Sequence, residues 1–261
     1  MSLGPPLLHL AEDGCATLTL QRPQHHHRLQ REDLLALQDH FRTLAAQPAA
    51  RVLVITASGP VFCSGFHLGE LEEAGGASAH PRLFEHTVDL LESLPLPTVA
   101  RLNGSVYGGA TDLALACDFR VGVQGMELRM PAARLGLHYY PSGLQRYVSR
   151  LGLQAAKRLF LLAQAVPAEE LLRIGYLDAL VPAAELDSAT RALVQALQAG
   201  APLAVQGMKL SLNETAAAEG GGAQTQAANM AERVARCAAS DDLREGLAAW
   251  AQKRAPRFTG R

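Results

Sequence analysis

Short apolar runs along this chain alternate with longer segments in which apolar residues recur every three or four positions. LLHL and ATLTL flank the turn-forming sequence Glu12-Asp13-Gly14 and predict a β-hairpin at the start of the chain. Residues 31–47 show helical spacing, carried by Leu34, Leu37, Phe41 and Leu44. RVLVIT at 51–56 predicts a short buried strand, so a strand, helix and strand open the chain.

This strand and helix alternation repeats. A helix is predicted over about 82–94, and two prolines separate it from the strand TVARL. GGATDLALAC then predicts a helix and DFRVGV a strand, and further helices are expected over about 142–150 and 153–164. The alternation predicts an α/β architecture. Repeated turns of two short strands and a helix fit a spiral, and periodicity alone leaves an open doubly wound sheet as the alternative.

From about residue 183 onward the sequence predicts helices almost throughout. Ala-rich segments are interrupted by Pro202 and by Gly220-Gly221-Gly222. We expect a helical appendage with apolar faces that the core does not cover completely, which fits a subunit interface.

Composition and charge narrow the classes of partner. The 24 basic and 25 acidic residues give a net charge of -1, which supplies no field to attract nucleic acid. No segment approaches the roughly 20 apolar residues of a membrane helix, and the first residues lack a basic region followed by an apolar run. We expect a soluble cytoplasmic protein that binds neither DNA nor a membrane.

The cysteines and a histidine cluster offer a metal site only superficially. The four cysteines lie far apart without a Cys-x-x-Cys pair, so we expect them to be reduced and to bind no metal. His25, His26 and His27 are consecutive, and side chains of three neighbours point in different directions. We therefore interpret them as a solvated loop.

Two glycine-containing segments carry the candidate chemistry. Gly108-Gly109 follows the loop at 103–107 and opens a helix, which exposes unpaired backbone N–H groups at the positive end of the helix dipole. A glycine there also allows close approach of a ligand oxygen. The segment at 61–68 follows a buried strand, and Ser64 and Gly65 permit a tightly curved backbone. Taken alone, the first fits mere helix packing and the second a simple turn.

Together these segments resemble the signatures of the crotonase (enoyl-CoA hydratase/isomerase) superfamily. Residues 62–68, FCSGFHL, are similar to the family pattern F-C-A-G-x-D-L, and residues 103–118, NGSVYGGATDLALACD, to N-G-x-x-x-G-G-G-x-E-L-A-x-x-C-D. The segment PAEELLRIGYLDALVP and the ending at 253–258 are also similar, so the resemblance covers nearly the whole chain. Residues at family spacing in between are Pro131, Gly136, Gly143, Gln145 and Arg146.

The resemblance implies a crotonase-like spiral of repeated ββα turns over residues 1–200 and a C-terminal helical trimerisation region over 201–261. It implies an acyl-CoA thioester as the ligand, no metal, no cofactor beyond the CoA of the substrate, and a homotrimer or a dimer of trimers. It also implies an oxyanion hole formed by the backbone N–H groups of Phe66 and Gly109. The residues expected to contact the substrate are Arg28, Ser64, Leu68 and Gly108.

The acid and base groups of the family are where this sequence departs from it. Asp112 stands where hydratases carry the first of two glutamates, and one helical turn from Gly108 its carboxylate is expected to face the cleft. Its structural alternative is a first-turn residue that complements the helix dipole. The second glutamate is Ala132, which transfers no proton. Hydration uses both carboxylates in the family, so we expect it to be weak or absent.

Three further side chains are candidates for proton transfer. His67 replaces the usual aspartate beside Phe66, with a structural histidine as an equal alternative. Tyr139 matches a tyrosine of the family's methylmalonyl-CoA decarboxylase, and Tyr140 stands where dehalogenase and dienoyl-CoA isomerase members place an aspartate. His138 is expected near the site but not in it. The resemblance thus implies a lyase or isomerase, with a non-catalytic acyl-CoA-binding homologue as the alternative.

Overall fold

The computed structural model describes residues 4–67, 80–217 and 223–261. Two sheets form its centre, a larger one of six strands in the order β1-β2-β3-β5-β7-β10 and a smaller one of four in the order β4-β6-β8-β9. β1 is antiparallel to β2, and the other pairings of the larger sheet are parallel. Its strands are β1 (Leu7–Leu10), β2 (Cys15–Leu20), β3 (Val52–Ala57), β5 (Thr98–Leu102), β7 (Phe119–Val123) and β10 (Ala179–Val181).

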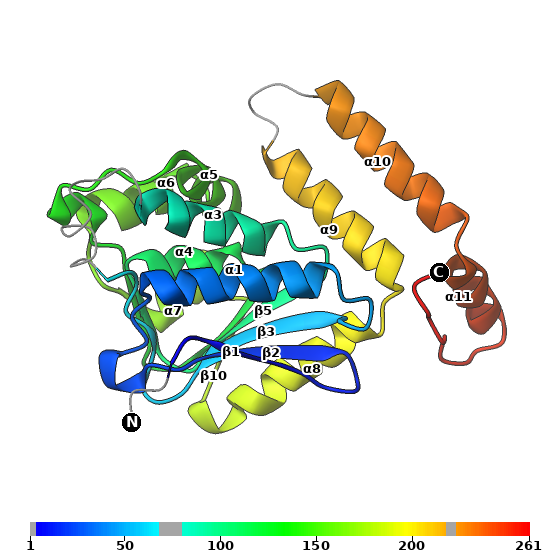
Figure 1. Ribbon diagram of the computed structural model, residues 1–261, viewed down its shortest axis with the longest axis horizontal. Coiled ribbons are helices and arrows are strands. Elements are labelled where there is room, and N and C mark those ends of the chain that lie inside the picture. Colours follow the sequence, from blue (N-terminus) through cyan, green and yellow to red (C-terminus); the bar gives the residue numbers. More distant parts are fainter. Residues whose placement is uncertain (1–3, 68–79, 218–222) are drawn as a thin grey trace.

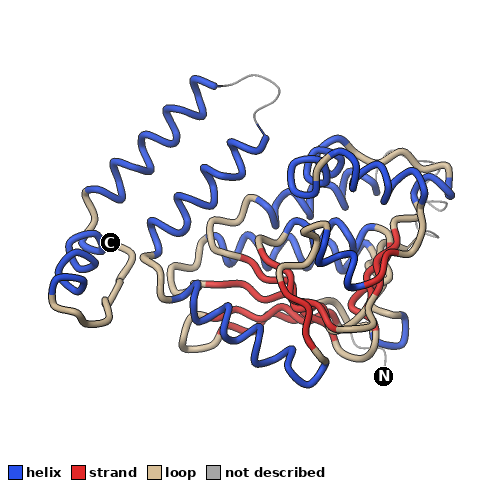
Figure 2. Tube along the Cα trace, turned by 180° about the vertical axis from the view of Figure 1, so that it is seen from behind, coloured by secondary structure: helices blue, strands red, loops and turns tan. Residues whose placement is uncertain are grey.

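Consecutive strands pass from the larger sheet to the smaller one and are followed by a helix. The smaller sheet consists of β4 (Val61–Cys63), β6 (Ser105–Tyr107), β8 (Glu127–Arg129) and β9 (Val166–Pro167). The helices that follow β4, β6 and β8 are α3 (His80–Glu92), α4 (Gly109–Ala116) and the short η2 (Ala132–Leu135) with α5 (Pro141–Leu151). These turns of two strands and a helix confirm the predicted spiral over the open doubly wound sheet. Figure 2 shows the strands gathered in one block.

The helical spacing of the first helix correctly predicted which side chains face the core. In α1 (Arg31–Ala45) the four residues at that spacing are at most 3% exposed. α1 packs on α3, and α3 packs on α4, so these helices cover one side of the larger sheet (Figure 1). α4 is buried on all sides, which agrees with its nearly unbroken apolar sequence.

The expected helix at 153–164 is interrupted. α6 (Leu153–Lys157) continues into a single π-helical turn, η3 (Arg158–Leu162), and the segment ends at Ala163 with a positive φ of 49°. α7 (Ala168–Arg173), η4 (Ala183–Glu185) and α8 (Leu186–Gln198) complete the core, and α8 packs against β3, β5 and β7. In Figure 1, α8 lies across the larger sheet from α1.

The helices after α8 extend away from the core as predicted, whereas α8, which the sequence placed in the same appendage, packs on the larger sheet. α9 (Pro202–Ala217) and α10 (Ala223–Ala238) lie side by side, and α11 (Asp241–Ala251) follows (Figure 1). Lys209 anchors α9, since its ammonium donates to the carbonyl of Leu96 at 2.9 Å and pairs with Asp118 at 2.8 Å. The division of the chain at residue 200 stays a prediction. No helix in the described part of the chain has both the length and the apolar character needed to span a membrane.

Candidate functional site

A cavity of about 220 Å³ lies where the loop after β4, the start of α4 and the loop before α5 meet. The structure brings six of the residues predicted from the sequence to its wall: Ser64, Phe66, Gly108, Gly109, Tyr139 and Tyr140. Leu68 lies outside the described residues. The rest of the wall is largely apolar, including Phe84 and Met130. The cavity therefore has the apolar lining with few polar groups that is typical of small-ligand sites.

The two glycine-containing loops touch each other at this cavity. Gly65 has a φ of +91°, and a Cβ built on it lies only 2.6 Å from the carbonyl oxygen of Tyr107 and 3.1 Å from the backbone nitrogen of Gly109. Any other residue at position 65 pushes the loops apart. Gly65 thus holds the backbone of Phe66 close to the backbone of Gly109.

An isolated β-bridge orients the backbone of Phe66. Phe66 pairs with Leu29 in a parallel bridge in which Leu29 donates to the carbonyl of Gly65 at 2.8 Å and accepts from the N–H of His67 at 2.9 Å. Successive peptide groups of an extended strand point to opposite sides. The N–H of Phe66 consequently points away from Leu29, toward the side on which α4 begins.

The N–H of Gly109 belongs to the first turn of α4, where helix geometry provides no intrahelical acceptor. Gly108 precedes it with a φ of +54° and donates its own N–H to Arg129 at 2.9 Å. Thr111 donates its N–H and its hydroxyl to the carbonyl of Gly108. The start of α4 is thereby fixed, and its dipole favours negative charge at the cavity wall.

The histidine cluster secures the Phe66 loop from behind, which the sequence did not reveal. His25 and His26 are exposed as predicted, but His27 is only 2% exposed, so a solvated loop is wrong for that residue. Its Nδ1 accepts from the N–H of Arg22 at 3.1 Å, and its Nε2 lies 2.7 Å from the carbonyl oxygen of Ser58 and donates to it.

The same segment binds the residues before Phe66 directly. The carbonyl of His27 accepts from the Cys63 thiol at 2.9 Å, and the carbonyl of His26 accepts from the N–H of Ser64 at 2.9 Å. Among the described residues there is no cluster of histidine, cysteine, aspartate or glutamate that forms a metal site. The histidine segment at 25–27 therefore supports the loop of the candidate oxyanion hole.

Acidification is expected to destabilise this segment through His27. Burial lowers the pKa of its imidazole below the ordinary 6.5, and the Ser58 carbonyl offsets this only in part. Below pH 6.5 the unfolded chain binds a proton that the folded chain does not, so the stability contributed by the neutral ring is lost as pH falls toward the lower folded pKa.

His27→Asn provides the matched control, because asparagine tolerates the φ of +52° and does not titrate. Urea denaturation from pH 7 to pH 5 is expected to show a free energy of unfolding that falls more steeply in the wild type. The difference in slope reaches up to about 1.4 kcal/mol per pH unit. Parallel slopes show that His27 is not the titrating group.

Asp112 does not face the cleft as the sequence suggested. It is fully buried, and its two carboxylate oxygens accept from one guanidinium nitrogen of Arg146 at 2.8 and 2.9 Å. Arg146 is itself buried and also pairs with Asp89 and Glu92, each at 2.9 Å. Burial lowers the pKa of Arg146, but Asp112 and Glu92 more than compensate and raise it. Asp112 therefore lies behind the cavity wall in an ion-pair network, and its catalytic role stays a prediction.

Both candidate tyrosines line the cavity while their hydroxyls point at Asp112. Tyr140 donates to Asp112 in a short hydrogen bond, and Tyr139 donates to it at 3.3 Å. Their rings stack with centroids 4.4 Å apart. Burial and the neighbouring Asp112 carboxylate raise the pKa of both tyrosines far above the ordinary value of 10. They are consequently hydrogen-bond donors and poor acids.

Gly143 explains how the two rings fit against the network. A Cβ built on Gly143 lies 2.5 Å from the ring of Tyr139, 2.8 Å from the ring of Tyr140 and 2.9 Å from Asp112. The sequence resemblance includes this glycine but gives no reason for it. Its role here is to leave room for the tyrosines.

His67 and Arg28 are not among the residues that line the cavity. His67 is half-buried, and its backbone takes part in the bridge to Leu29. Arg28 is also half-buried, and among the described residues its buried Nε has no hydrogen-bond partner. Proton transfer by His67 and contact of Arg28 with CoA stay predictions.

His138 and Ala132 both line the cavity. The sequence placed His138 outside the site, but the loop before α5 lines the same cavity as the start of α4 and brings His138 into its wall. Ala132 lies in the wall at the position where hydratases carry their second glutamate. The cavity therefore lacks that carboxylate.

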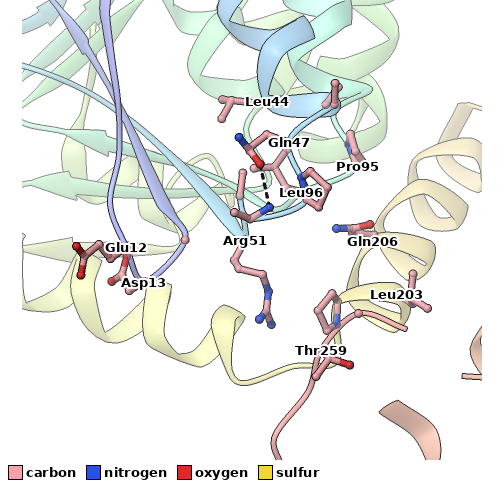
Figure 3. A pocket seen from close by; sticks show the side chains of 18 of the residues that line it. Glu12, Asp13, Leu44, Gln47, Arg51, Pro95, Leu96, Leu203, Gln206 and Thr259 are labelled. Carbon is pink, nitrogen blue, oxygen red and sulfur yellow. Dashed lines mark hydrogen bonds between the residues drawn. The ribbon is translucent and has the colours of Figure 1, made fainter. Parts of the chain in front are cut away.

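A larger cavity of about 580 Å³ lies between the turn after β1, the start of β3 and α9 (Figure 3). Arg51 enters this space, and its guanidinium donates to the carbonyls of Gln198 and Gly200 at 2.9 and 3.0 Å. It therefore ties the connection between α8 and α9 to the core. Neither Phe66 nor Gly109 lines this cavity, so we place the site in the smaller one.

The profile of the family described as enoyl-CoA hydratase/isomerase matches residues 11–261. An enoyl-CoA isomerase/hydratase of Mycosarcoma maydis, fer4, is 30% identical, with 98% of each chain covered. A crotonyl-CoA hydratase of Syntrophomonas wolfei is 29% identical, with 95% of each chain covered. The solved structure of an enoyl-CoA hydratase from Mycobacterium smegmatis gives a TM-score of 0.87 at 25% identity and covers 98% of this chain and 99% of that one. This chain belongs to the enoyl-CoA hydratase/isomerase family of the crotonase superfamily.

Proposed function

We propose that the cavity holds the acyl group of an acyl-CoA thioester and that the N–H groups of Phe66 and Gly109 stabilise its enolate. The observation that carries this proposal is the contact between the two donor loops at the cavity wall. Negative charge accumulates on the thioester oxygen when the enolate forms. Two fixed donors in a dry site contribute roughly 3–4 kcal/mol each to stabilising that charge.

Decarboxylation or isomerisation fits this site better than hydration. Hydration in the family uses a pair of carboxylates, but Ala132 has none and the carboxylate of Asp112 is engaged by Arg146. The described residues of the wall include no lysine or arginine. A substrate carboxylate in such a wall is poorly stabilised, which favours its departure as carbon dioxide.

The volume of the cavity also limits the size of the acyl group. Its volume of about 220 Å³ is below the roughly 300–1,000 Å³ of sites for drug-sized ligands. We propose a short acyl chain, with the CoA moiety outside the cavity. No metal and no cofactor beyond this CoA is proposed.

The reaction type is tested with a panel of short thioesters. Methylmalonyl-CoA and malonyl-CoA are offered for decarboxylation, 3-butenoyl-CoA for isomerisation and crotonyl-CoA for hydration, with carbon dioxide and acyl products measured by mass spectrometry. We expect carbon dioxide release or double-bond migration at least tenfold faster than hydration. Efficient hydration of crotonyl-CoA without either reaction contradicts the proposal.

The second candidate is a homologue that binds acyl-CoA without turnover. The burial of Asp112 in an ion pair favours it, because the one carboxylate left from the hydratase pair is withdrawn from the cavity. Calorimetric binding of butyryl-CoA without turnover across the panel supports this second candidate.

A trimer or a dimer of trimers is proposed from the C-terminal helices. Met208, Leu212, Val234 and Leu247 are each about 60–70% exposed on α9, α10 and α11. Sedimentation equilibrium is expected to give three or six subunits, and a monomer contradicts the proposal.

We also propose a cytoplasmic location. Burial raises the pKa of the Cys63 and Cys117 thiols to about 12, which suits cysteines that stay reduced.

A further inference from the structure

We propose that His138 is the acid–base residue of this cavity and exchanges a proton with the α-carbon of the bound acyl group. This inference rests on the proposed enolate chemistry and names the group that completes it. Three observations support it: His138 lines the cavity, one of its ring nitrogens makes no hydrogen bond to the described residues, and the tyrosine hydroxyls of the wall are already hydrogen-bonded.

Among the described residues of the wall, the titratable side chains are three tyrosines and His138. Each tyrosine hydroxyl is directed to a carboxylate: Tyr107 donates to Glu127 at 3.0 Å, and Tyr139 and Tyr140 donate to Asp112. A tyrosine that gave up its proton would leave a phenolate against a carboxylate. The tyrosines are therefore occupied as donors.

His138 differs from the tyrosines in having a reactive atom that is not engaged. Its Nδ1 lies 2.8 Å from the carbonyl oxygen of Tyr139, and a carbonyl accepts only, so Nδ1 carries a proton. In the neutral ring the lone pair is then on Nε2. The structure gives no other hydrogen bond to this imidazole among the described residues, and the side chain is exposed, so Nε2 also has access to water.

The proton and electron balance is simple. When His138 acts as a base, the Cα–H bond breaks, its proton passes to Nε2, and its electron pair moves to the thioester oxygen held by Phe66 and Gly109. In a decarboxylation the bond from Cα to the carboxylate breaks instead, and carbon dioxide leaves. For that route His138 starts as the imidazolium: the enolate takes the proton from Nε2 at Cα, and the neutral imidazole that remains regains a proton from the solvent.

Exchange of the α-protons of butyryl-CoA in D2O isolates this step, because it needs the oxyanion hole and a base but no leaving group. His138→Asn keeps a donor near the Nδ1 position for the Tyr139 carbonyl and removes the base. His138→Ala removes both and opens space for imidazole. Exchange is followed by proton NMR, with calorimetry for binding and thermal unfolding for folding.

We expect both variants to bind butyryl-CoA and to unfold like the wild type while exchanging at least about 100-fold more slowly. Added imidazole is expected to restore exchange in His138→Ala. If His138→Asn exchanges protons at the wild-type rate, the assignment of His138 is overturned while the enolate chemistry stands. His138 then has only a loop-positioning role. A wild type that binds butyryl-CoA and exchanges nothing overturns the enolate chemistry and this inference together.

Discussion

Replacing Gly109 by proline is expected to slow α-proton exchange of butyryl-CoA by about 10²–10³-fold relative to replacing it by alanine. Proline removes the N–H that we assign to the oxyanion hole, and alanine keeps it. Proline is well tolerated at the first position of a helix, where the N–H makes no intrahelical bond. The two variants therefore differ in the proposed donor and in the proline ring, whose Cδ takes the place of the N–H hydrogen.

The added Cβ is the complication in this comparison, and it is shared by both variants. A Cβ on Gly109 lies 2.7 Å from the ring of Phe84. Both substitutions are therefore best made together with Phe84→Leu, which shortens the opposing side chain. Equal exchange rates in the alanine and proline variants, with equal thermal stability, show that the N–H of Gly109 does not stabilise the enolate.

Replacing Arg146 by methionine is expected to reduce the free energy of unfolding by about 3–5 kcal/mol, measured in urea at pH 7. Among the described residues, the change leaves the fully buried carboxylate of Asp112 with the two tyrosine hydroxyls as its partners. A buried charge without its counter-ion is strongly destabilising. The rings of Tyr139 and Tyr140 are expected to lose their fixed orientation as well.

Two further variants separate the buried pair from the rest of the network. Asp89→Asn removes the more exposed partner of Arg146 and is expected to cost less than about 1 kcal/mol. Asp112→Asn combined with Arg146→Met removes both buried charges and is expected to recover much of the loss. A double variant as unstable as Arg146→Met alone contradicts a structural role for the Asp112 charge.

The sequence predicted those parts of the fold that are encoded locally. A buried apolar run predicts β3 and helical spacing predicts α1, and both occur within a few residues of the expected positions. The strands β4, β6 and β8 contain three residues each, too few for any periodic signal. The spiral therefore followed from the family resemblance and not from the pattern.

The backbone of the candidate site was predicted better than its side chains: Tyr139 and Tyr140 line the cavity as expected, but Asp112 does not. Motif positions correctly brought Phe66 and Gly109 to one cavity, because backbone donors depend only on the course of the chain. The direction of Asp112 depends on Arg146, which lies 34 residues away on α5. The burial of His27 depends likewise on the distant Ser58 carbonyl, and the place of His138 in the cavity wall depends on loops that meet only in the folded protein. Such contacts leave no spacing signal in the sequence.

The most direct test of the oxyanion hole is a crystal structure of this protein with a bound short-chain acyl-CoA or a stable enolate analogue. We predict that the thioester oxygen lies 2.7–3.1 Å from the backbone nitrogens of both Phe66 and Gly109, the distances typical of such sites. An acyl group bound in this cavity with its oxygen directed elsewhere contradicts the proposal, and so does an acyl group bound in the larger cavity beside Arg51.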